Sequence, residues 1–446
     1  MIKKIVFILI LIFLIGCAPQ NNIEIKEEIT EKITESKSGI AFEIGLGNLC
    51  TGQSECISFC TNNHGRCEAY CRGKEIELCG IIFPPHAQDK GPQNNRGCVG
   101  KGTVEFKSPP MRIEDIQIIE PIGLMIGGHV TPIDHGYYTA KTWIPGSSRE
   151  DPGKFVDIFA TASGTVTQVQ SMPSVYSSSS IGDYRIVIYH TCTFYTIYIH
   201  VNQLSEKLQS IADTNKNAEV EAGELIGRAP GFDFSVHNDE ITLKGFIVPE
   251  NYIFEPWKIH TVDMFEHFAE PVRSQLLDKN VRQKEPRGGK IDYDIDGRLV
   301  GNWFVEKTNG YMGIAKSPGE YGYWNTHLAF AYDGLDSSLI IVSMGNFNGE
   351  ARQFAVKGNA PDPANVDASS GLVKYELVEM GHITDEGKMW DRLSFARISM
   401  AFGYDHVIGV ALVQMLDDRK IKFESFPGRT ASEIADFTNK AKIYER

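Results

Sequence analysis

The sequence predicts a mainly β protein with two β domains, preceded by a small helical module held by disulfide bonds. Glycine and proline are frequent, at 42 and 20 residues, and aromatic residues make up 10% of the chain. This composition is typical of many short strands joined by turns. A further observation, the crowding of cysteines between residues 49 and 100, predicts the separate module.

The size and charge of the chain limit its partners. With 446 residues, the chain has room for more than one domain with its own core. Its formal net charge is −13, and no basic stripe interrupts the acidic surface. Since binding to a phosphate backbone needs clustered positive charge, we expect no nucleic-acid partner.

The N-terminus predicts export to a membrane. Lys3 and Lys4 precede an apolar run over residues 5–15, which is too short to span a bilayer and fits the apolar core of a secretory signal. The following "LIGC" resembles a lipobox, and that resemblance implies that residues 1–17 are a signal peptide and that Cys17 carries lipid. The alternative is an uncleaved signal anchor. Both place the protein outside the cytoplasm, attached to the membrane.

A charged tether over residues 18–48 leads into a cysteine-rich module over residues 49–100. In "CISFC" and "CEAYC" two cysteines share one face of a helical turn. An exported segment this short cannot bury enough apolar area alone, so disulfides are expected, with zinc held by the CxxxC pairs and His64 as the competing interpretation. Cys192 either pairs with the odd cysteine of this module or stays a buried thiol. The disulfide candidates are Cys50, Cys56, Cys60, Cys67, Cys71, Cys79, Cys98 and Cys192.

Two β domains follow. Residues 105–271, the middle domain, contain alternating and β-branched runs such as "DIFATASGTVTQVQ" and "DYRIVIYHTCTFYTIYIHV". Residues 272–291 are charged and interrupted by proline and glycine, which predicts a linker. Residues 292–446, the C-terminal domain, repeat strand patterns about eight times, which predicts one antiparallel β barrel or sandwich.

Three segments of the middle domain occur in the order found in one peptidase family. "FATASGTVTQV" turns at a Ser-Gly pair, "VIYHTCTFYTIYIHV" gives two strands, and "VEAGELIGRAPG" gives another turn. Together they resemble the lysostaphin-type (LytM-type) zinc metallopeptidases, which cut peptide cross-links of bacterial cell walls. The resemblance covers roughly residues 120–240. It implies a β domain of the barrel-sandwich or duplicated-hybrid type.

The resemblance also implies a chemistry. In this family, zinc is held by an HxxxD motif and by the last histidine of an HxH motif, with other histidines beside it. Two imidazoles and one carboxylate leave a fourth position on the metal open. A water bound there has its pKa lowered to about 7, and the metal polarises the scissile carbonyl. Neighbouring histidines transfer protons or stabilise the oxyanion.

Three residues match positions of the family pattern. Asp134 stands where the family has its aspartate ligand. His200, in "YIH", matches the active-site histidine, and His190 matches the histidine of the preceding strand. The resemblance therefore implies that Asp134 is a metal ligand and that the two histidines are catalytic.

The remaining positions depart from the family. His129 lies one position too far from Asp134, giving HxxxxD, and His135 follows directly after. The strand "GFDFSV" places Gly231 and Asp233 where the family has the two histidines of HxH. Because a general acid or base contributes about 100-fold or more to a rate, the glycine predicts weakened hydrolysis.

Three outcomes stay open for this site. In the first, a metal is held by Asp134, Asp233 and either His129 or His135, and it is zinc or a harder ion such as manganese or calcium. In the second, the site holds no metal and forms a polar network at a strand end. In the third, the histidines are ordinary, partly buried residues.

A second motif, "DYDIDG" at residues 292–297, is similar to the opening of a calcium-binding loop. Its twelfth position is Trp303, where such a loop needs a bidentate glutamate, and no helix pattern follows. We therefore expect a solvated turn here and no calcium cofactor.

The leading hypothesis is a lipid-anchored cell-envelope protein whose middle domain binds envelope peptide, glycan or a partner protein, with weakened or lost catalysis. One alternative is an active zinc metalloendopeptidase acting on cell-wall or surface peptides, so the sequence leaves open whether the chain is an enzyme. Another is a structural surface adaptor that binds through its C-terminal β domain. The peptidase-like interpretations require Asp134 and Asp233 to lie close together.

Overall fold

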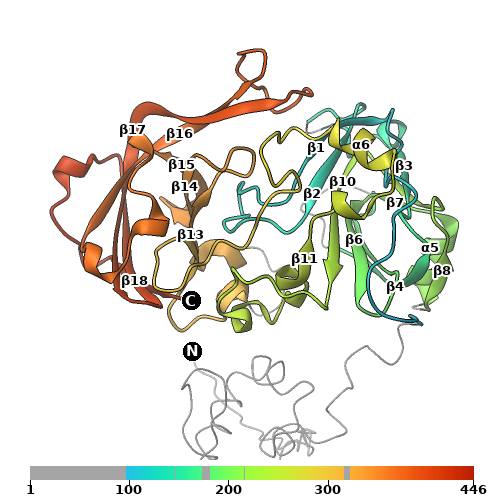
Figure 1. Cartoon of the computed structure of the whole chain (residues 1–446), viewed down its shortest axis with the longest axis horizontal. Helices are drawn as coiled ribbons and strands as arrows, with labels where there is room; N and C mark the ends of the chain where they lie inside the picture. The colour runs from blue at the N-terminus through green and yellow to red at the C-terminus, as the bar shows by residue number, and fades with distance from the viewer. Residues whose placement is uncertain (1–96, 146, 173–180, 215, 316–321) are drawn as a thin grey trace, which may run out of the picture. The chain divides into compact units, whose positions relative to one another are not determined.

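The computed structural model describes residues 97–145, 147–172, 181–214, 216–315 and 322–446. They lie in a compact unit formed by Lys90–Arg446 (Figure 1). The predicted mainly β class is confirmed, because strands dominate the described part of the chain. No helix among these residues is long and apolar enough to cross a membrane. The predicted signal peptide and tether lie outside the described residues, as do Cys17, Cys50, Cys56, Cys60, Cys67, Cys71 and Cys79.

The described part of the middle domain contains an eight-stranded antiparallel sheet and a smaller sheet (Figure 1). In spatial order the first contains β1 (Ile116–Glu120), β2 (Gly136–Ala140), β10 (Gly231–Asn238), β6 (Phe194–Val201), β5 (Tyr184–Tyr189), β4 (Gly164–Ser171) and β8 (Ala218–Val220), while β11 (Thr261–Val262) pairs with β10. The second contains β3 (Val156–Phe159), β9 (Leu225–Ala229) and β7 (Gln203–Leu204).

Short helices complete this domain and its connection to the next. Helix α5 (Glu206–Thr214) is amphipathic and buries Leu208 and Ile211. Further helical segments include α6 (Val272–Leu277) and the 3-10 helices η4 (Pro256–His260), η6 (Gly310–Met312) and η7 (Tyr323–Thr326).

Strand β10 lies inside the large sheet, between β2 and β6, and all eight of its residues are buried. Its aromatic residues Phe232 and Phe234 pack against the rings of Tyr138 and Tyr198. A polar side chain in such a strand must find a partner inside the protein. Asp233 is therefore a buried carboxylate whose neighbours decide the chemistry of the site.

The predicted C-terminal β barrel is confirmed. The described residues form a closed antiparallel barrel of β12 (Gly301–Val305), β13 (His327–Tyr332), β14 (Ile340–Phe347), β15 (Glu350–Val356), β16 (Val373–Thr384), β17 (Ile398–Asp417), β18 (Lys420–Pro427) and β19 (Lys442–Glu445). Trp303 is completely buried in it and donates a hydrogen bond of 2.8 Å from Nε1 to the carbonyl of Leu299. The buried Trp303 ring and this hydrogen bond together anchor β12, the first strand of the barrel.

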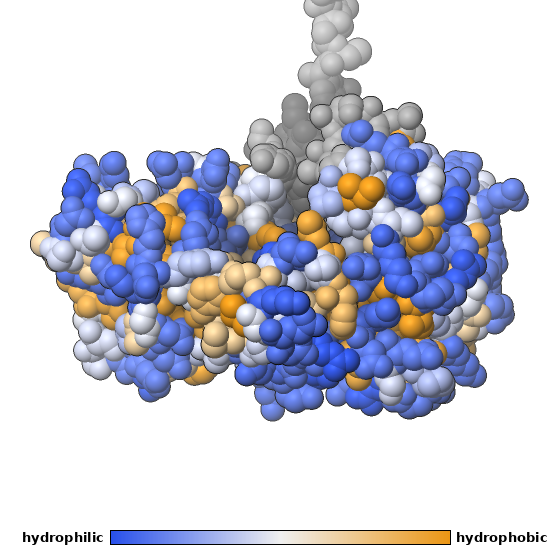
Figure 2. All heavy atoms as spheres, turned by 90° about the horizontal axis from the view of Figure 1, so that it is seen from above, coloured by the Kyte–Doolittle hydropathy of each residue, from blue (hydrophilic) through white to orange (hydrophobic). Residues whose placement is uncertain are grey.

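Strands β16 and β17 continue beyond the barrel as a two-stranded arm, seen at the top of Figure 1. The arm packs Trp390 and Ile398 against Ile118 and Val281 in one buried cluster. The view in Figure 2, from above, shows a largely hydrophilic surface with hydrophobic residues between. The cluster joins residues of the middle and C-terminal domains through a shared core.

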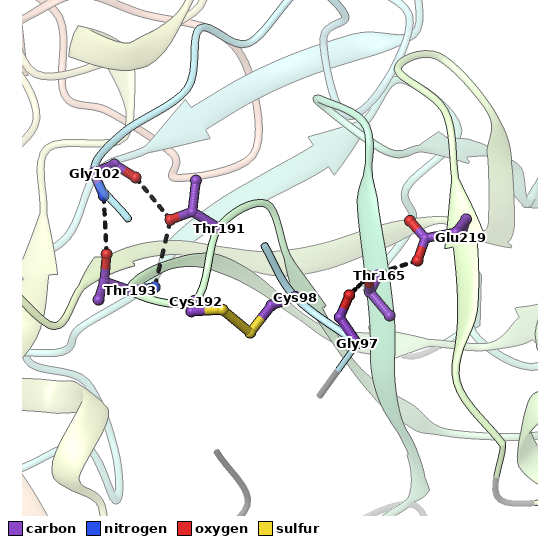
Figure 3. The surroundings of a disulfide bond; sticks show 8 residues. All are labelled: Gly97, Cys98, Gly102, Thr165, Thr191, Cys192, Thr193 and Glu219. Atoms are coloured by element: carbon purple, nitrogen blue, oxygen red, sulfur yellow. Dashed lines mark hydrogen bonds between the residues drawn. A yellow bond between two sulfur atoms is a disulfide. The ribbon is translucent and has the colours of Figure 1, made fainter. Parts of the chain in front are cut away.

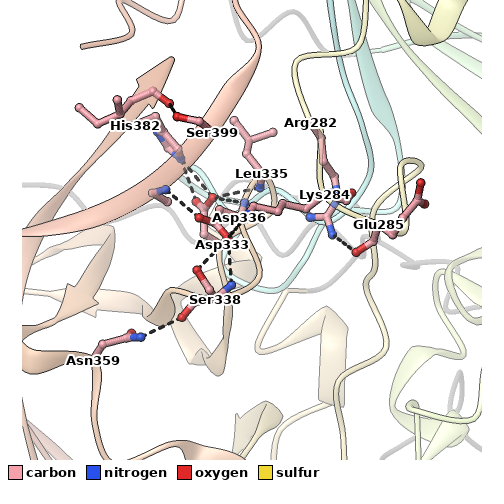
Figure 4. A network of polar contacts seen from close by, with 12 residues as sticks. Arg282, Lys284, Glu285, Asp333, Leu335, Asp336, Ser338, Asn359, His382 and Ser399 are labelled. Carbon is pink, nitrogen blue, oxygen red and sulfur yellow. Dashed lines mark hydrogen bonds and ion pairs between the residues drawn. The ribbon is translucent and has the colours of Figure 1, made fainter. Parts of the chain in front are cut away.

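One arginine of the predicted linker is buried in the protein. Arg282 is completely buried, since its guanidinium donates to the carbonyls of Gly334, Pro286, Lys284 and Glu285. Beside it lies a second polar group (Figure 4), which we call the Asp333 cluster and which consists of Asp333, Asp336 and His382. Backbone carbonyls therefore explain how Arg282 is buried, whereas Lys284 and Glu285 of the same segment are exposed.

Cys192 forms a disulfide with Cys98, 94 positions away (Figure 3). This outcome agrees with the prediction that Cys192 pairs with a cysteine of the cysteine-rich module. Thr191 and Thr193, on either side of Cys192, exchange hydrogen bonds with Gly102. The bridge therefore fixes the start of the described chain to the turn between β5 and β6.

Candidate functional site

The loop between β1 and β2, together with β10 and β6, brings the predicted site residues together. Asp233 of β10 is paired in register with Tyr137 of β2 and with Ile199 of β6. His135 directly precedes β2, and His200 follows Ile199. Adjacent strands are about 4.8 Å apart, so the register alone places both histidines next to Asp233.

Five side chains form a row in which carboxylates and imidazoles alternate. Asp134 Oδ1 lies 3.5 Å from His135 Nδ1, and His135 Nε2 lies 3.3 Å from Asp233 Oδ2. The same Asp233 oxygen lies 3.6 Å from His200 Nε2. His200 Nδ1 is hydrogen-bonded to Asp183, at 3.0 Å from both carboxylate oxygens. We call these five residues the charge row.

Lys258, in η4, extends the charge row beyond Asp134. Its Nζ lies 3.6 Å from Asp134 Oδ1 and 4.8 Å from the centroid of the Tyr311 ring. The side chain is completely buried, and Nζ has no hydrogen-bond partner among the described residues. Burying an ammonium group in this way is costly. The Asp134 charge and the face of the Tyr311 ring offset part of that cost.

The backbone at His200 is unusual. The pairing of β5 with β6 shifts between Tyr184 and Ile186, so that β6 carries a bulge at this point. His200 has a φ of 67°, in the left-handed region that non-glycine residues rarely adopt. Bulges re-aim side chains, and such strain persists where surrounding contacts hold it. Here the contacts are those with the two carboxylates.

Charges in the row compensate one another. Burial would raise the pKa of Asp134, but Lys258 and His135 outweigh it and hold that pKa well below its usual range. Burial would lower the pKa of His200, but the carboxylates of Asp233 and Asp183 outweigh it and raise the pKa. The lysine and a protonated His200 thus offset most of the negative charge of the three carboxylates.

These residues do not fit a zinc ion in the way that the resemblance implies. Asp134 faces the Lys258 ammonium, and His135 turns one ring nitrogen toward Asp134 and the other toward Asp233. Zinc ligands must instead direct their lone pairs at one point. In the described part of the chain, no three His, Cys, Asp or Glu side chains are arranged to hold a metal ion.

The C-terminal domain covers the loop that carries Asp134. The side chain of Gln353 exchanges two hydrogen bonds, each 3.0 Å long, with the backbone of Gly127. A Cβ added at Gly128 would lie 2.9 Å from the ring of Trp324, so the indole packs directly on the loop. Contacts from β15 and η7 of the C-terminal domain therefore cover this loop.

His129 stands beside the charge row without joining it. Its ring contacts that of His135 edge-on, with the centroids 5.5 Å apart. Burial, His135 and Lys258 lower the pKa of His129 to about 3. The ring is therefore neutral at physiological pH, and the structure gives it no contact with Asp233.

His190 lies away from the charge row, which corrects its predicted place beside a metal. Its Nδ1 is 3.0 Å from the Ser163 carbonyl and its Nε2 is 3.1 Å from the Thr196 hydroxyl. His190 precedes β6, whereas His200 lies near the other end of that strand. At about 3.3 Å per residue, the strand separates the two histidines by about 20 Å.

Sequence reasoning missed Lys258 and Asp183. Lys258 lies in "EPWKIH", a short segment whose burial depends on Tyr311 of another domain. Asp183 ends a polar insertion and stands directly before β5, the neighbour of the strand that carries His200. That position, one residue before a strand paired with "YIH", is the signal that could have identified it.

No protein-family model and no curated protein matches the sequence. Among solved structures, the chain is similar to the SpoIIQ–SpoIIIAH pore-forming complex, with 14% identity over 39% of this chain and 96% of that chain and a TM-score of 0.24. It is also similar to lysostaphin, with 11% identity over 67% of this chain and 100% of that chain and a TM-score of 0.22. A zinc-containing peptidase from Vibrio cholerae has 18% identity over 32% of this chain and 36% of that chain, with a TM-score of 0.19. Because these TM-scores are low, the similarities carry no argument about the function of this chain.

Proposed function

We propose that this protein is a lipid-anchored cell-envelope protein whose peptidase-like middle domain binds envelope peptide, glycan or a partner protein without hydrolysing it. The observation that supports this function is the charge row closed by Lys258. The carboxylates that a catalytic metal would need already face the protein's own lysine and imidazoles. The site therefore lacks an open position for an activated water.

The limited solvent access to the charge row supports binding of a partner over hydrolysis. Asp134, His135 and Asp233 are only 6%, 8% and 5% exposed. A hydrolytic water and a scissile bond would both have to reach this group of atoms in one geometry. The His200 side chain is 23% exposed, so it is the member of the row that a bound partner would contact most readily.

The envelope location rests on the N-terminal sequence. Two lysines, an apolar run and Cys17 stand in the order of a lipoprotein signal. A charged tether over residues 18–48 then gives the folded domains reach from the membrane. This arrangement favours partners within the envelope.

An active zinc endopeptidase is the second candidate function, and one contact favours it. His135 Nε2 is buried and has no hydrogen-bond partner among the described residues, although Asp233 Oδ2 lies 3.3 Å away. A small cation between these two atoms would satisfy both. The alternative of an adaptor acting through the barrel has no comparable contact.

Incubation of the full chain with purified peptidoglycan and with isolated envelope fragments, with and without added zinc, tests the proposed function. Mass spectrometry detects new amino termini, and co-sedimentation with the insoluble material detects binding. We expect binding without cleavage, and weaker binding by H200A because its ring is the accessible member of the row.

The controls separate the candidates. D213A removes an exposed carboxylate on α5 and should bind like the wild type. Zinc-dependent cleavage that disappears in D233A would overturn the proposal in favour of the peptidase. Absence of both cleavage and binding would favour the adaptor.

A further inference from the structure

We infer that the Lys258 ammonium fills a cation site, and that this site takes up a divalent metal ion once the lysine charge is removed. The inference rests on the proposed function, in which the site is closed to metals. Lys258 would then be the residue that keeps the middle domain metal-free, and its replacement would be the shortest route to a metal-binding form.

The first argument is the environment of the ammonium. Lys258 is completely buried, and Nζ has no hydrogen-bond partner in the described part of the chain. Its neighbours are the Asp134 carboxylate at 3.6 Å and the Tyr311 ring at 4.8 Å. A lysine used only for packing would send its charge to water, so this position selects a positive charge.

The second argument is what the removal of that charge would leave. Asp134 would become a buried carboxylate without its cation, next to His135, whose other nitrogen faces Asp233. An unpaired buried charge is strongly unfavourable and favours uptake of a counter-ion. Carboxylate oxygens and imidazole nitrogens are ligands that zinc and cobalt accept.

The third argument is the reach of the lysine charge. Lys258 also contributes to the electrostatics of His129, Glu255 and His327, which come from three separate segments. Two of these side chains are imidazoles and one is a carboxylate. The lysine charge therefore repels a dication beyond its contact with Asp134, although among the described residues no three His, Cys, Asp or Glu side chains surround one metal position.

The test measures zinc and cobalt binding to the full chain and to K258M, with K258R as the matched control. Equilibrium dialysis gives the affinity, and the visible absorption of Co²⁺ reports the ligand geometry. We expect K258M to bind one equivalent at least about 100-fold more tightly than the wild type. Removing a like charge about 4 Å away, at an effective dielectric constant of about 20, accounts for a change of this order or larger. K258R keeps the charge and should stay like the wild type.

The double variant K258M/D134N locates the metal. It removes the carboxylate together with the lysine, so it should fold without a metal and lose the gained affinity. If K258M alone unfolds, added zinc should restore its circular dichroism spectrum, and failure to do so counts against the inference. Equal, weak binding by folded K258M and the wild type would overturn it.

These outcomes separate the inference from the proposed function. A wild-type protein that cleaves envelope peptides with bound zinc contradicts both. A wild-type protein that is inert, together with a K258M variant that gains no affinity, contradicts only the role of Lys258.

Discussion

The protein contains two buried groups of histidine and carboxylate side chains, and they differ in whether their polar atoms have hydrogen-bond partners. In the Asp333 cluster, Asp333 accepts hydrogen bonds from two backbone amides of its own loop and lies 3.1 Å from His382 Nε2 (Figure 4). In the charge row, His135 Nε2 and the adjacent Lys258 Nζ have no hydrogen-bond partner among the described residues. Only the first group is fully satisfied.

This difference separates a structural network from a candidate site. A buried network in which every group has a partner specifies the fold and rigidifies it. A group with unpaired atoms and a strained backbone, as at His200 with its φ of 67°, is where function is expected. The two groups should therefore respond differently to substitution and to pH.

The largest expected effect is that of D333A on stability. The variant leaves two buried backbone amides and His382 without their acceptor. We expect the free energy of unfolding to fall by about 3 kcal/mol or more, as measured by chemical denaturation of the full chain.

D362A is the matched control. Asp362 also accepts a backbone amide hydrogen bond at the start of a short helix, but it is only partly buried. Asp362 also accepts a hydrogen bond from the Tyr332 hydroxyl, so its loss should cost about 1–2 kcal/mol. Equal costs for the two variants would contradict the structural role assigned to the Asp333 cluster.

A second prediction concerns the pH dependence of stability, which should have opposite directions for His200 and for Asp333. The pKa of His200 is raised above 6.5, because its two carboxylates outweigh burial. Its stabilising contribution is therefore complete below pH 6.5 and is lost as the pH rises through the folded pKa. The pKa of Asp333 is lowered below 3.8, since hydrogen bonds and His382 outweigh burial. Its contribution is present above pH 3.8 and is lost as the pH falls.

Denaturation curves of H200Q and of the wild type across this pH range provide the measurement. In the wild type, the free energy of unfolding should fall by up to about 1.4 kcal/mol per pH unit above pH 6.5, and H200Q should lack this fall. The pH dependence of the unfolding free energy at acid pH should be the same in both proteins. A difference confined to acid pH would mean that His200 is neutral in the folded protein.

The smallest expected effect is that of K284A. Lys284 Nζ lies 4.0 Å from Asp336 in the Asp333 cluster, but its side chain is 48% exposed. Exposed ion pairs contribute little, so the free energy of unfolding should change by less than about 0.5 kcal/mol. A cost as large as that of D333A would show that this cluster, too, depends on a lysine.

The sequence was sufficient to predict the parts of the fold that depend on strand pattern. Alternating runs predicted the barrel, and "GFDFSV" and "YIH" were placed on strands that proved to be neighbours. The assignment of Asp134, His135, Asp233 and His200 to one site came from the family resemblance of their segments, and the register of these strands brings them together.

What the sequence could not predict depends on contacts between distant segments. The sequence gives no sign that Lys258 and Arg282 are buried, because lysine and arginine are mostly exposed. Their burial depends on the Tyr311 ring and on the Gly334 carbonyl, which belong to the other domain. Similarly, the family resemblance predicts His190 beside the metal site. In the structure, His190 precedes β6 and His200 lies near the other end of that strand, so the two histidines are far apart.

The disulfide between Cys98 and Cys192 has a mechanical consequence. Tension applied to the chain before Cys98 passes through the covalent bridge into the turn between β5 and β6, and so bypasses the chain between the two cysteines. Both strands lie inside the large sheet and are paired on each side. Such a load would shear several hydrogen-bonded ladders at once, whereas a pull without the bridge would peel the segment away from its end.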